Sequence, residues 1–395
     1  MTASTRHEQV LAFGTGYLTT RILRDGPHYL WCRAPGPART GGFTPVPATA
    51  RRALAALPPH GARVVLGEDT PTEPEQDTAA RPGDNPADAA TERRYRAGSA
   101  YSPGHVPGTD RVAPAGEDTP MEPGQEAAAR AGGNAATERR YRADAAYSLG
   151  HVLGNHRAAP DQWAALPRLL RQVGRTLRTV HEQVPASAAA GAPRGTLRLA
   201  GWLAGRPGPG QAGRLHREAH ARLGRDRLAR AAQWCAALNT PGERDVFLLG
   251  GAALGAMVPD PSGTGCLIMA GEELARGPAA YDLGWTLGEL AEFRLLHFAA
   301  GNDEAAAAAA HCAEASGALL DGYGAAGTDR AEVARAAVLR VLLHTHDYAA
   351  FVDWTDQLTQ YLDLLADLID HPLAAVGDFP DAPAGHRQTH QPEEQ

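Results

Sequence analysis

Residues 246–260 read VFLLGGAALGAMVPD, and residues 277–284 read GPAAYDLG. The first stretch begins as an apolar strand and continues into a glycine-containing loop. Between Asp245 and Asp260 it contains no His, Asp, Glu or Asn. Its glycines lack the GxGxxG spacing, and Pro259 prevents the helix that follows a dinucleotide-binding loop. The stretch therefore predicts a strand and loop without polar catalytic side chains.

The sequence upstream predicts a small β-rich lobe, residues 1–66. Turn residues separate three β-branched and aromatic runs, which is typical of an antiparallel meander. These runs are residues 9–13, 17–24 and 28–33. A short helix is expected at residues 48–57 and a further strand at residues 63–66.

Downstream, apolar residues recur at three- and four-residue steps from Asp161, which is the period of a helix. Further helices are expected at residues 283–298, 305–320, 331–343 and 348–369. We therefore expect a larger, mainly helical lobe over residues 161–370. The polar, Pro-rich tail, residues 371–395, is expected to be disordered. The predicted fold class is α+β, with a small antiparallel β lobe followed by this helical lobe.

The two lobes are separated by an internal duplication in residues 67–160. The sequence GEDTP occurs at residues 67–71 and 116–120, and TERRYRA occurs at 91–97 and 137–143. Two copies rich in Pro, Gly, Ala and charge favour a largely disordered insert over a folded repeat array. The second copy is the better candidate for order. TERRYRA predicts an amphipathic linker helix, and a docking segment for an acidic partner is the alternative.

Composition excludes several classes of function. The formal net charge is −7, which argues against nucleic-acid binding. The chain contains no Lys, so it has no phosphate-loop lysine and no Schiff-base lysine. Four scattered cysteines without CxxC spacing indicate buried thiols. The start is not a secretory signal, and no apolar run is long enough to span a membrane. We therefore expect a cytoplasmic protein without a membrane partner.

A series of weaker signals occurs in a recognisable order. A glycine-containing hairpin is followed by a strand ending at Arg33, then by LRTVH at residues 177–181, then by the two stretches quoted above. This order resembles the aminoglycoside phosphotransferase and choline kinase-like family, over roughly residues 10–66 and 161–364. The resemblance implies a protein kinase-like two-lobed fold and an ancestry in phosphoryl transfer.

The catalytic loop of that family reads His-Gly-Asp, four residues, then Asn. A second Asp lies seven residues before the glycine that Gly277 matches. There the loop Asp orients the attacking hydroxyl, and the Asn and second Asp hold Mg²⁺. Aligned without a gap, the His falls on Leu249, the Gly on Gly250, the loop Asp on Gly251, the Asn on Ala256 and the metal Asp on Ala270. The resemblance therefore implies that all three polar catalytic residues are absent.

The resemblance assigns weaker roles to other residues. Gly14 and Gly16 lie where a phosphate-covering hairpin belongs, although two glycines in a hairpin are more common as a plain turn. Arg33 lies where a cation would contact phosphates. The helix at 48–57 has no Glu to pair with that cation. Asp282 is expected to support the catalytic loop, and His181 to pack and hydrogen-bond beside it. No metal site is expected, because Glu272, the weak candidate, cannot hold Mg²⁺ well alone.

Residues 344–347 read HTHD and raise a separate metal hypothesis. On a helix, His344 and Asp347 share a face, but His346 does not. A solvated helix end is therefore the favoured interpretation of this sequence.

The sequence favours a pseudokinase-like protein that binds a partner protein, peptide or small molecule. Leu249, Ala252, Leu254, Ala256 and Met257 would then line an apolar cleft. The resemblance suggests a natural-product or antibiotic-related pathway, and no cofactor is expected. The alternative is a divergent phosphotransferase that uses ATP and Mg²⁺ on the hydroxyl of a small molecule, or on Ser/Thr of a ribosomal precursor peptide before elimination.

Overall fold

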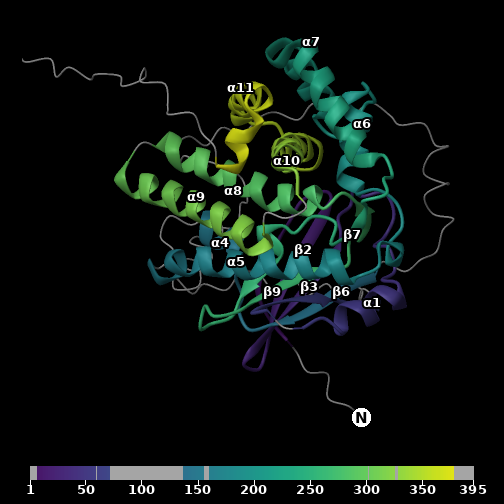
Figure 1. Cartoon of the computed structure of the whole chain (residues 1–395), viewed down its shortest axis with the longest axis vertical. Coiled ribbons are helices and arrows are strands. Elements are labelled where there is room, and N and C mark those ends of the chain that lie inside the picture. The colour runs from purple at the N-terminus through teal and green to yellow at the C-terminus, as the bar shows by residue number, and fades with distance from the viewer. Residues whose placement is uncertain are drawn as a thin grey trace, which may run out of the picture.

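A computed structural model describes residues 7–58, 60–71, 137–154, 160–300, 302–324 and 328–377. They form a β-rich region and a larger helical region (Figure 1). The strands are β1 (Glu8–Gly14), β2 (Leu18–Asp25), β3 (His28–Pro35), β4 (Ala62–Leu66), β5 (Glu68–Pro71), β6 (Thr137–Ala143), β7 (Val246–Leu248), β8 (Met257–Pro259), β9 (Cys266–Ala270) and β10 (Ala275–Gly277). The α-helices are α1 (Ala48–Ala55), α4 (Leu149–Gly154), α5 (Pro160–Gln183), α6 (Arg194–Leu203), α7 (Ala212–Asn239), α8 (Ala280–Ala300), α9 (Asp303–Tyr323), α10 (Arg330–Phe351) and α11 (Gln357–Asp370). Short 3-10 turns lie at Ala186–Ala188, Leu254–Ala256 and Pro372–Val376.

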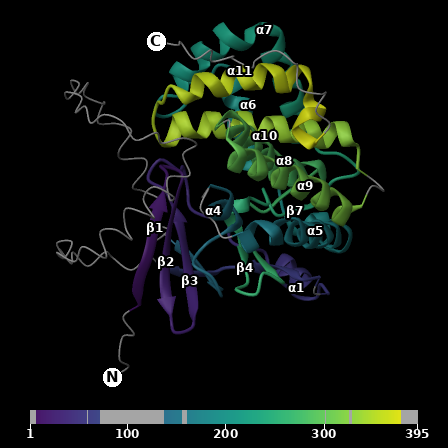
Figure 2. The same cartoon turned by 90° about the vertical axis from the view of Figure 1, so that its left-hand side faces the viewer.

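The N-terminal sheet has five strands in the order β1-β2-β3-β6-β5, and neighbouring strands are antiparallel. The predicted meander forms its first three strands (Figure 2). The turn from β2 to β3 places Gly26 at φ +61°, a conformation that glycine adopts without steric cost. The α+β class, with a small antiparallel sheet before a larger helical region, is confirmed.

Two strands of this sheet lie inside the predicted insert. Thr137–Ala143, expected as a linker helix, is strand β6, so that expectation is wrong. Tyr141 and Ala143 face the core while Arg142 is exposed, the alternation of a strand on a half-buried sheet. The sheet therefore extends beyond the boundary expected at residue 66. Residues 72–136, which include the first copy of TERRYRA, lie outside the described residues, and their disorder stays a prediction. The tail expected at 371–395 begins with the ordered 3-10 turn Pro372–Val376, and its residues from 378 lie outside the described residues.

The expected strand at residues 63–66 is β4, but it does not join the meander. It pairs in parallel with β9, in a second sheet of order β4-β9-β8. Val258 and Leu267 of that sheet pack in one buried cluster with Ile22, Trp31 and Tyr141 of the N-terminal sheet. This packing places the residues that follow β9 directly beside β3 and β6.

The helical region packs around α5, whose apolar residues recur every three or four positions and are buried. Helix α5 lies against α9, and α8 lies against α10 (Figure 1). The helix expected at residues 348–369 is interrupted, because α10 continues to Phe351 and α11 begins at Gln357. Side-chain caps stabilise two of these helices: Asn302 accepts from the Ala305 amide, and Asp329 from the Ala331 amide.

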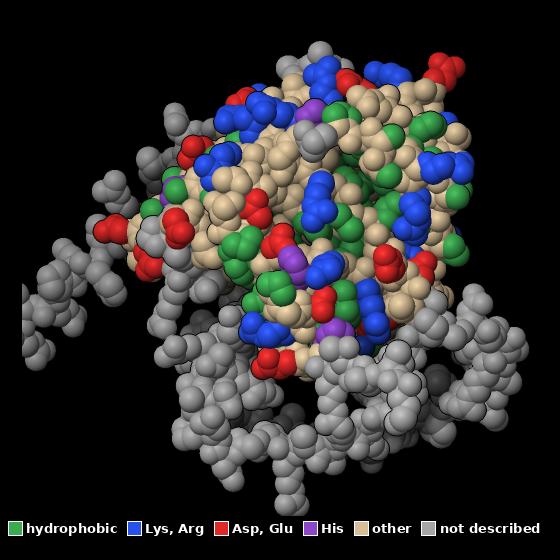
Figure 3. Space-filling model, turned by 90° about the horizontal axis from the view of Figure 1, so that it is seen from below, with side chains coloured by type: hydrophobic (Ala, Val, Ile, Leu, Met, Phe, Trp, Pro, Cys, Tyr) green, Lys and Arg blue, Asp and Glu red, His purple; other side chains and the backbone are tan. Residues whose placement is uncertain are grey.

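No helix in the described ranges is both long enough and apolar enough to cross a membrane. All four cysteines are buried and unpaired. On the face drawn in Figure 3, basic and acidic side chains are interspersed.

Candidate functional site

Asp282 hydrogen-bonds to the loop after β7, and it is completely buried near the start of α8. Its carboxylate accepts hydrogen bonds from the amides of Leu249 at 2.7 Å and Gly251 at 2.9 Å. The ring of His181 lies beside it, with Nε2 at 3.3 Å from the carboxylate and Nδ1 at 3.0 Å from the Tyr323 hydroxyl. Asp282 therefore fixes the backbone path of this loop.

That path leaves no room for side chains at two positions. Gly250 has φ +87°, and a Cβ there would lie 1.7 Å from the carbonyl oxygen of Glu273. Gly251 has φ +113°, and a Cβ there would lie 2.8 Å from the ring of Trp285. Residues other than glycine rarely adopt such positive φ angles. Gly251 is the position where the resemblance puts the catalytic Asp, so this backbone excludes that side chain.

The apolar residues around the loop do not form an open cleft, which corrects an expectation from the sequence. Leu249, Ala252, Leu254, Ala256 and Met257 are all at most 4% exposed. All except Ala256 belong to the main hydrophobic cluster, together with Ala270. Ala256 packs in the second cluster, under the N-terminal sheet. These residues are therefore part of the core and do not line a binding surface.

The space between the lobes is occupied by charged and aromatic side chains. Arg33, at the end of β3, donates to the Glu272 carboxylate at 3.0 Å, and the Tyr141 hydroxyl donates to it at 2.7 Å. Burial raises the pKa of Glu272, but Arg33 and the Tyr141 hydrogen bond outweigh burial, so the pKa lies below its usual 4.5. Arg33, which the resemblance places near phosphates, and Glu272, the weak metal candidate, therefore neutralise each other.

Glu273 is engaged in the same way. Its carboxylate lies 2.9 Å from Arg39 and accepts a 2.7 Å hydrogen bond from the Tyr17 hydroxyl. The Arg39 guanidinium is sandwiched between aromatic rings, 4.6 Å from the centre of Tyr17 and 4.9 Å from that of Phe43. This arrangement ties the β1–β2 hairpin to the segment after β9.

A third arginine, Arg198, connects the β1–β2 hairpin to the helical region. Arg198 of α6 donates to the Tyr17 hydroxyl at 2.6 Å and to Asp347 of α10 at 2.7 Å. His346 is 3% exposed and lies 2.8 Å from Asp347. The expectation of a solvated helix end at residues 344–347 is therefore wrong, because these residues lie within α10 and face its neighbours. We call Arg33, Tyr141, Glu272, Arg39, Tyr17, Glu273, Arg198 and Asp347 the interlobe centre.

The two hairpin glycines bring the backbone close to other segments. A Cβ on Gly14 would lie 2.9 Å from the carbonyl oxygen of Leu18. The Gly16 amide donates a 2.7 Å hydrogen bond to the carbonyl oxygen of Phe351, at the end of α10. The amide expected to cover a phosphate is thus already bonded to the helical region.

The interlobe centre does not fit the magnesium and nucleotide that the resemblance implies. Glu272 and Glu273 each accept a hydrogen bond from an arginine or a tyrosine, so neither carboxylate is free to coordinate Mg²⁺. Within the described ranges, no three His, Cys, Asp or Glu side chains gather as metal ligands. The centre can instead hold the two lobes in a fixed relation.

Sequence reasoning missed Tyr17, Arg39, Arg198 and Asp347. Their partners are between 149 and 256 residues away in the chain, and no local pattern joins them. Sequence reasoning also looked for the partner of Arg33 on the helix at residues 48–57. In the structure, that partner is Glu272, which follows β9. The sequence identified Glu272 as a weak metal candidate, but it did not identify Glu272 as the partner of Arg33.

No family model and no curated protein matches this sequence. Among solved structures, the chain is similar to a spectinomycin phosphotransferase bound to ADP and spectinomycin, with 9% identity over 93% of each chain and a TM-score of 0.46. It is similar to an aminoglycoside phosphotransferase from Streptomyces rimosus, with 15% identity over 84% of this chain and 91% of that chain and a TM-score of 0.35. It is also similar to a glucosamine kinase bound to glucosamine, ADP and phosphate, with 14% identity over 93% and 94% of the chains and a TM-score of 0.35. At such identities and TM-scores these likenesses carry no argument about this chain.

Proposed function

We propose that this chain is a pseudokinase-like protein with a phosphotransferase-like fold, which binds a partner protein, peptide or small molecule and transfers no phosphoryl group. The observation that carries this proposal is the backbone at Gly251. Its φ of +113° and the Trp285 ring exclude a carboxylate at the position of the catalytic Asp. The mutual neutralisation of Arg33 and Glu272 supports it, because both groups would otherwise serve the nucleotide and its metal.

The proposal is tested by titrating the full chain with ATP, with and without Mg²⁺, in a thermal-shift assay and by calorimetry. We expect no Mg²⁺-dependent stabilisation and no release of ADP in the presence of hydroxyl acceptors. The alternative, a divergent phosphotransferase, requires Mg²⁺-dependent stabilisation and ADP release. It also requires that Glu272→Gln or Arg33→Met abolish the release while Arg51→Met, at an exposed arginine of α1, leaves it unchanged.

The cellular location and the pathway of this protein are also proposals. Four buried, unpaired cysteines suit a reducing compartment, so we propose a cytoplasmic location. The sequence resemblance supports a natural-product or antibiotic-related pathway. A companion lyase and a Ser/Thr-rich precursor peptide encoded beside this chain would favour the phosphotransferase alternative in such a pathway, and their absence would favour the binding role.

A further inference from the structure

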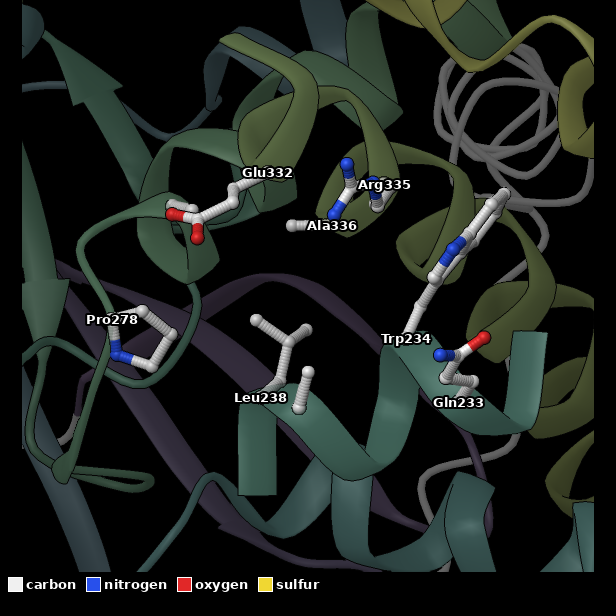
Figure 4. Close-up of a pocket in the computed structure, with 9 residues that line it drawn as sticks. Gln233, Trp234, Leu238, Pro278, Glu332, Arg335 and Ala336 are labelled. Atoms are coloured by element: carbon white, nitrogen blue, oxygen red, sulfur yellow. The ribbon is translucent and has the colours of Figure 1, made fainter. Parts of the chain in front are cut away.

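A hollow outside the interlobe centre lies between α7, α10 and the turn before α8 (Figure 4). Its volume is about 450 Å³, which is within the range of small-molecule sites. A neighbouring hollow of about 460 Å³ shares Pro278, Ala280 and Glu332 with it. We call the first of these the α7/α10 cavity. None of its lining residues belongs to the interlobe centre.

One part of the cavity wall is apolar. Trp234 and Leu238 contribute from α7, Pro278 from the turn before α8, and Ala336 from α10. Trp234 is only half-buried, so its ring keeps a face that a ligand can cover. Figure 4 shows Trp234 and Pro278 at opposite sides of the cavity, with Leu238 on its floor. An aromatic or branched apolar group fits such walls.

The other part of the wall carries two opposite charges. Glu332 and Arg335 are three residues apart on α10, so their side chains leave the same face of the helix, with Cβ atoms about 5–6 Å apart. Both side chains are half-buried. Within the described part of the chain, neither makes an ion pair or a side-chain hydrogen bond, with each other or with any other group. In Figure 4, Glu332 lies on the Pro278 side and Arg335 on the Trp234 side.

Glu332 and Arg335 have no charged partner among the described residues, and they lie beside an apolar wall, so together they indicate which chemical groups a ligand would carry. Half-buried charges without partners are costly, and a ligand that pairs with only one leaves the other unsatisfied. Arginine binds carboxylates through two parallel hydrogen bonds, and a carboxylate side chain binds an ammonium group. We propose that the α7/α10 cavity binds a small zwitterion with an apolar or aromatic body, of the class of the free apolar and aromatic amino acids. Arg335 holds its carboxylate, Glu332 holds its ammonium group, and Trp234 and Leu238 pack on its body.

The proposal uses none of the residues on which the pseudokinase-like function rests, so each stands or fails alone. Its first test is calorimetry of the full chain with free phenylalanine, tyrosine, tryptophan, leucine, isoleucine, valine and methionine at concentrations up to the millimolar range. We expect at least one to bind saturably. We expect its N-acetyl and carboxamide derivatives, which each lack one charge, to bind at least about tenfold more weakly. Absence of binding by all seven, or equal binding of the derivatives, overturns the proposal.

Variants locate the binding. Glu332→Gln and Arg335→Gln keep the side-chain size nearly constant, and each is expected to weaken binding by about tenfold or more. Glu314→Gln, at an exposed position of α9, is the matched control and should leave the affinity unchanged. In Trp234→Phe, the calorimetric signal should persist while the ligand-induced change in tryptophan fluorescence is lost. Unchanged affinity in both charge variants, with native circular dichroism, contradicts the proposed site.

Discussion

The interlobe centre and the α7/α10 cavity both gather charged side chains, and they differ in whether those charges have partners among the described residues. In the interlobe centre, Arg33, Arg39 and Arg198 each face a carboxylate within 3.0 Å. In the cavity, Glu332 and Arg335 make no such contact within the described residues. Paired charges hold segments of the chain together, whereas unpaired charges are available to a ligand. The proposed ligand site therefore lies where the charges are unpaired, and the interlobe centre is a structural contact between the lobes.

The largest effect expected from this difference comes from removing one carboxylate of each region. Glu272→Ala leaves the half-buried Arg33 without its carboxylate and leaves the Tyr141 hydroxyl with only the Ala270 carbonyl oxygen as acceptor, so it should cost about 3–5 kcal/mol of unfolding free energy. Glu332→Ala should cost less than about 0.5 kcal/mol, because this side chain makes no ion pair with a described residue. Urea unfolding measures both. Similar costs for the two variants would remove the distinction between the regions.

A second variant tests whether the loop can accept the missing carboxylate. Gly251→Asp should cost about 2–4 kcal/mol, since it combines a positive φ with a collision against the Trp285 ring. Gly41→Asp shares a positive φ, +80°, but nothing lies within 4 Å of its Cβ position, so it isolates the backbone cost. Thermal and urea unfolding compare the two. Two results would contradict our account of this loop. One is a Gly251→Asp protein as stable as Gly41→Asp, and the other is a Gly251→Asp protein that releases ADP.

A smaller effect is expected where a single hydroxyl joins the lobes. Tyr17→Phe removes the hydrogen bond to Glu273 and the one from Arg198 but keeps the ring that stacks on Arg39, so we expect a loss of about 1–2 kcal/mol. Tyr29→Phe is the control, because the Tyr29 hydroxyl makes no hydrogen bond to another described residue. Equal stability of the two variants would show that the hairpin is not held through this hydroxyl.

The smallest effect concerns pH. The pKa values of Glu272 and Asp347 lie below their ordinary 4.5 and 3.8, because neighbouring arginines outweigh the effect of burial. A carboxylate with a lowered folded-state pKa stabilises the fold above its unfolded pKa, and this stabilisation is lost as the pH falls through the folded value. The stability advantage of the wild type over Glu272→Gln should therefore shrink as the pH falls below about 4.5. Urea unfolding between pH 3 and pH 7 measures this advantage, and one that stays constant would mean that Glu272 is not ionised in the folded protein.

The sequence predicted local structure better than it predicted the site. The meander, α1 and α5 follow from turn residues and from apolar periodicity, which are properties of neighbouring residues. Strand β6 was predicted as a helix because TERRYRA is short and its pairing with β3 depends on a distant segment. Leu249 and Met257 were placed in a cleft because an apolar run reads alike whether it lines a surface or fills a core. Packing decided that question, and packing was not available from the sequence.

The pairing of β5 with β6 has a consequence for how this chain can change in length. Pro71 and Thr137 are directly opposite each other in that ladder, so the chain leaves the sheet and returns to it at one point. A change in the length of the chain between these residues is compatible with the same β5–β6 register. A variant that lacks one copy of the duplication should therefore keep the five-stranded sheet. Since β5 lies in the first copy and β6 in the second copy of the duplicated sequence, either copy alone carries the sequence of both strands.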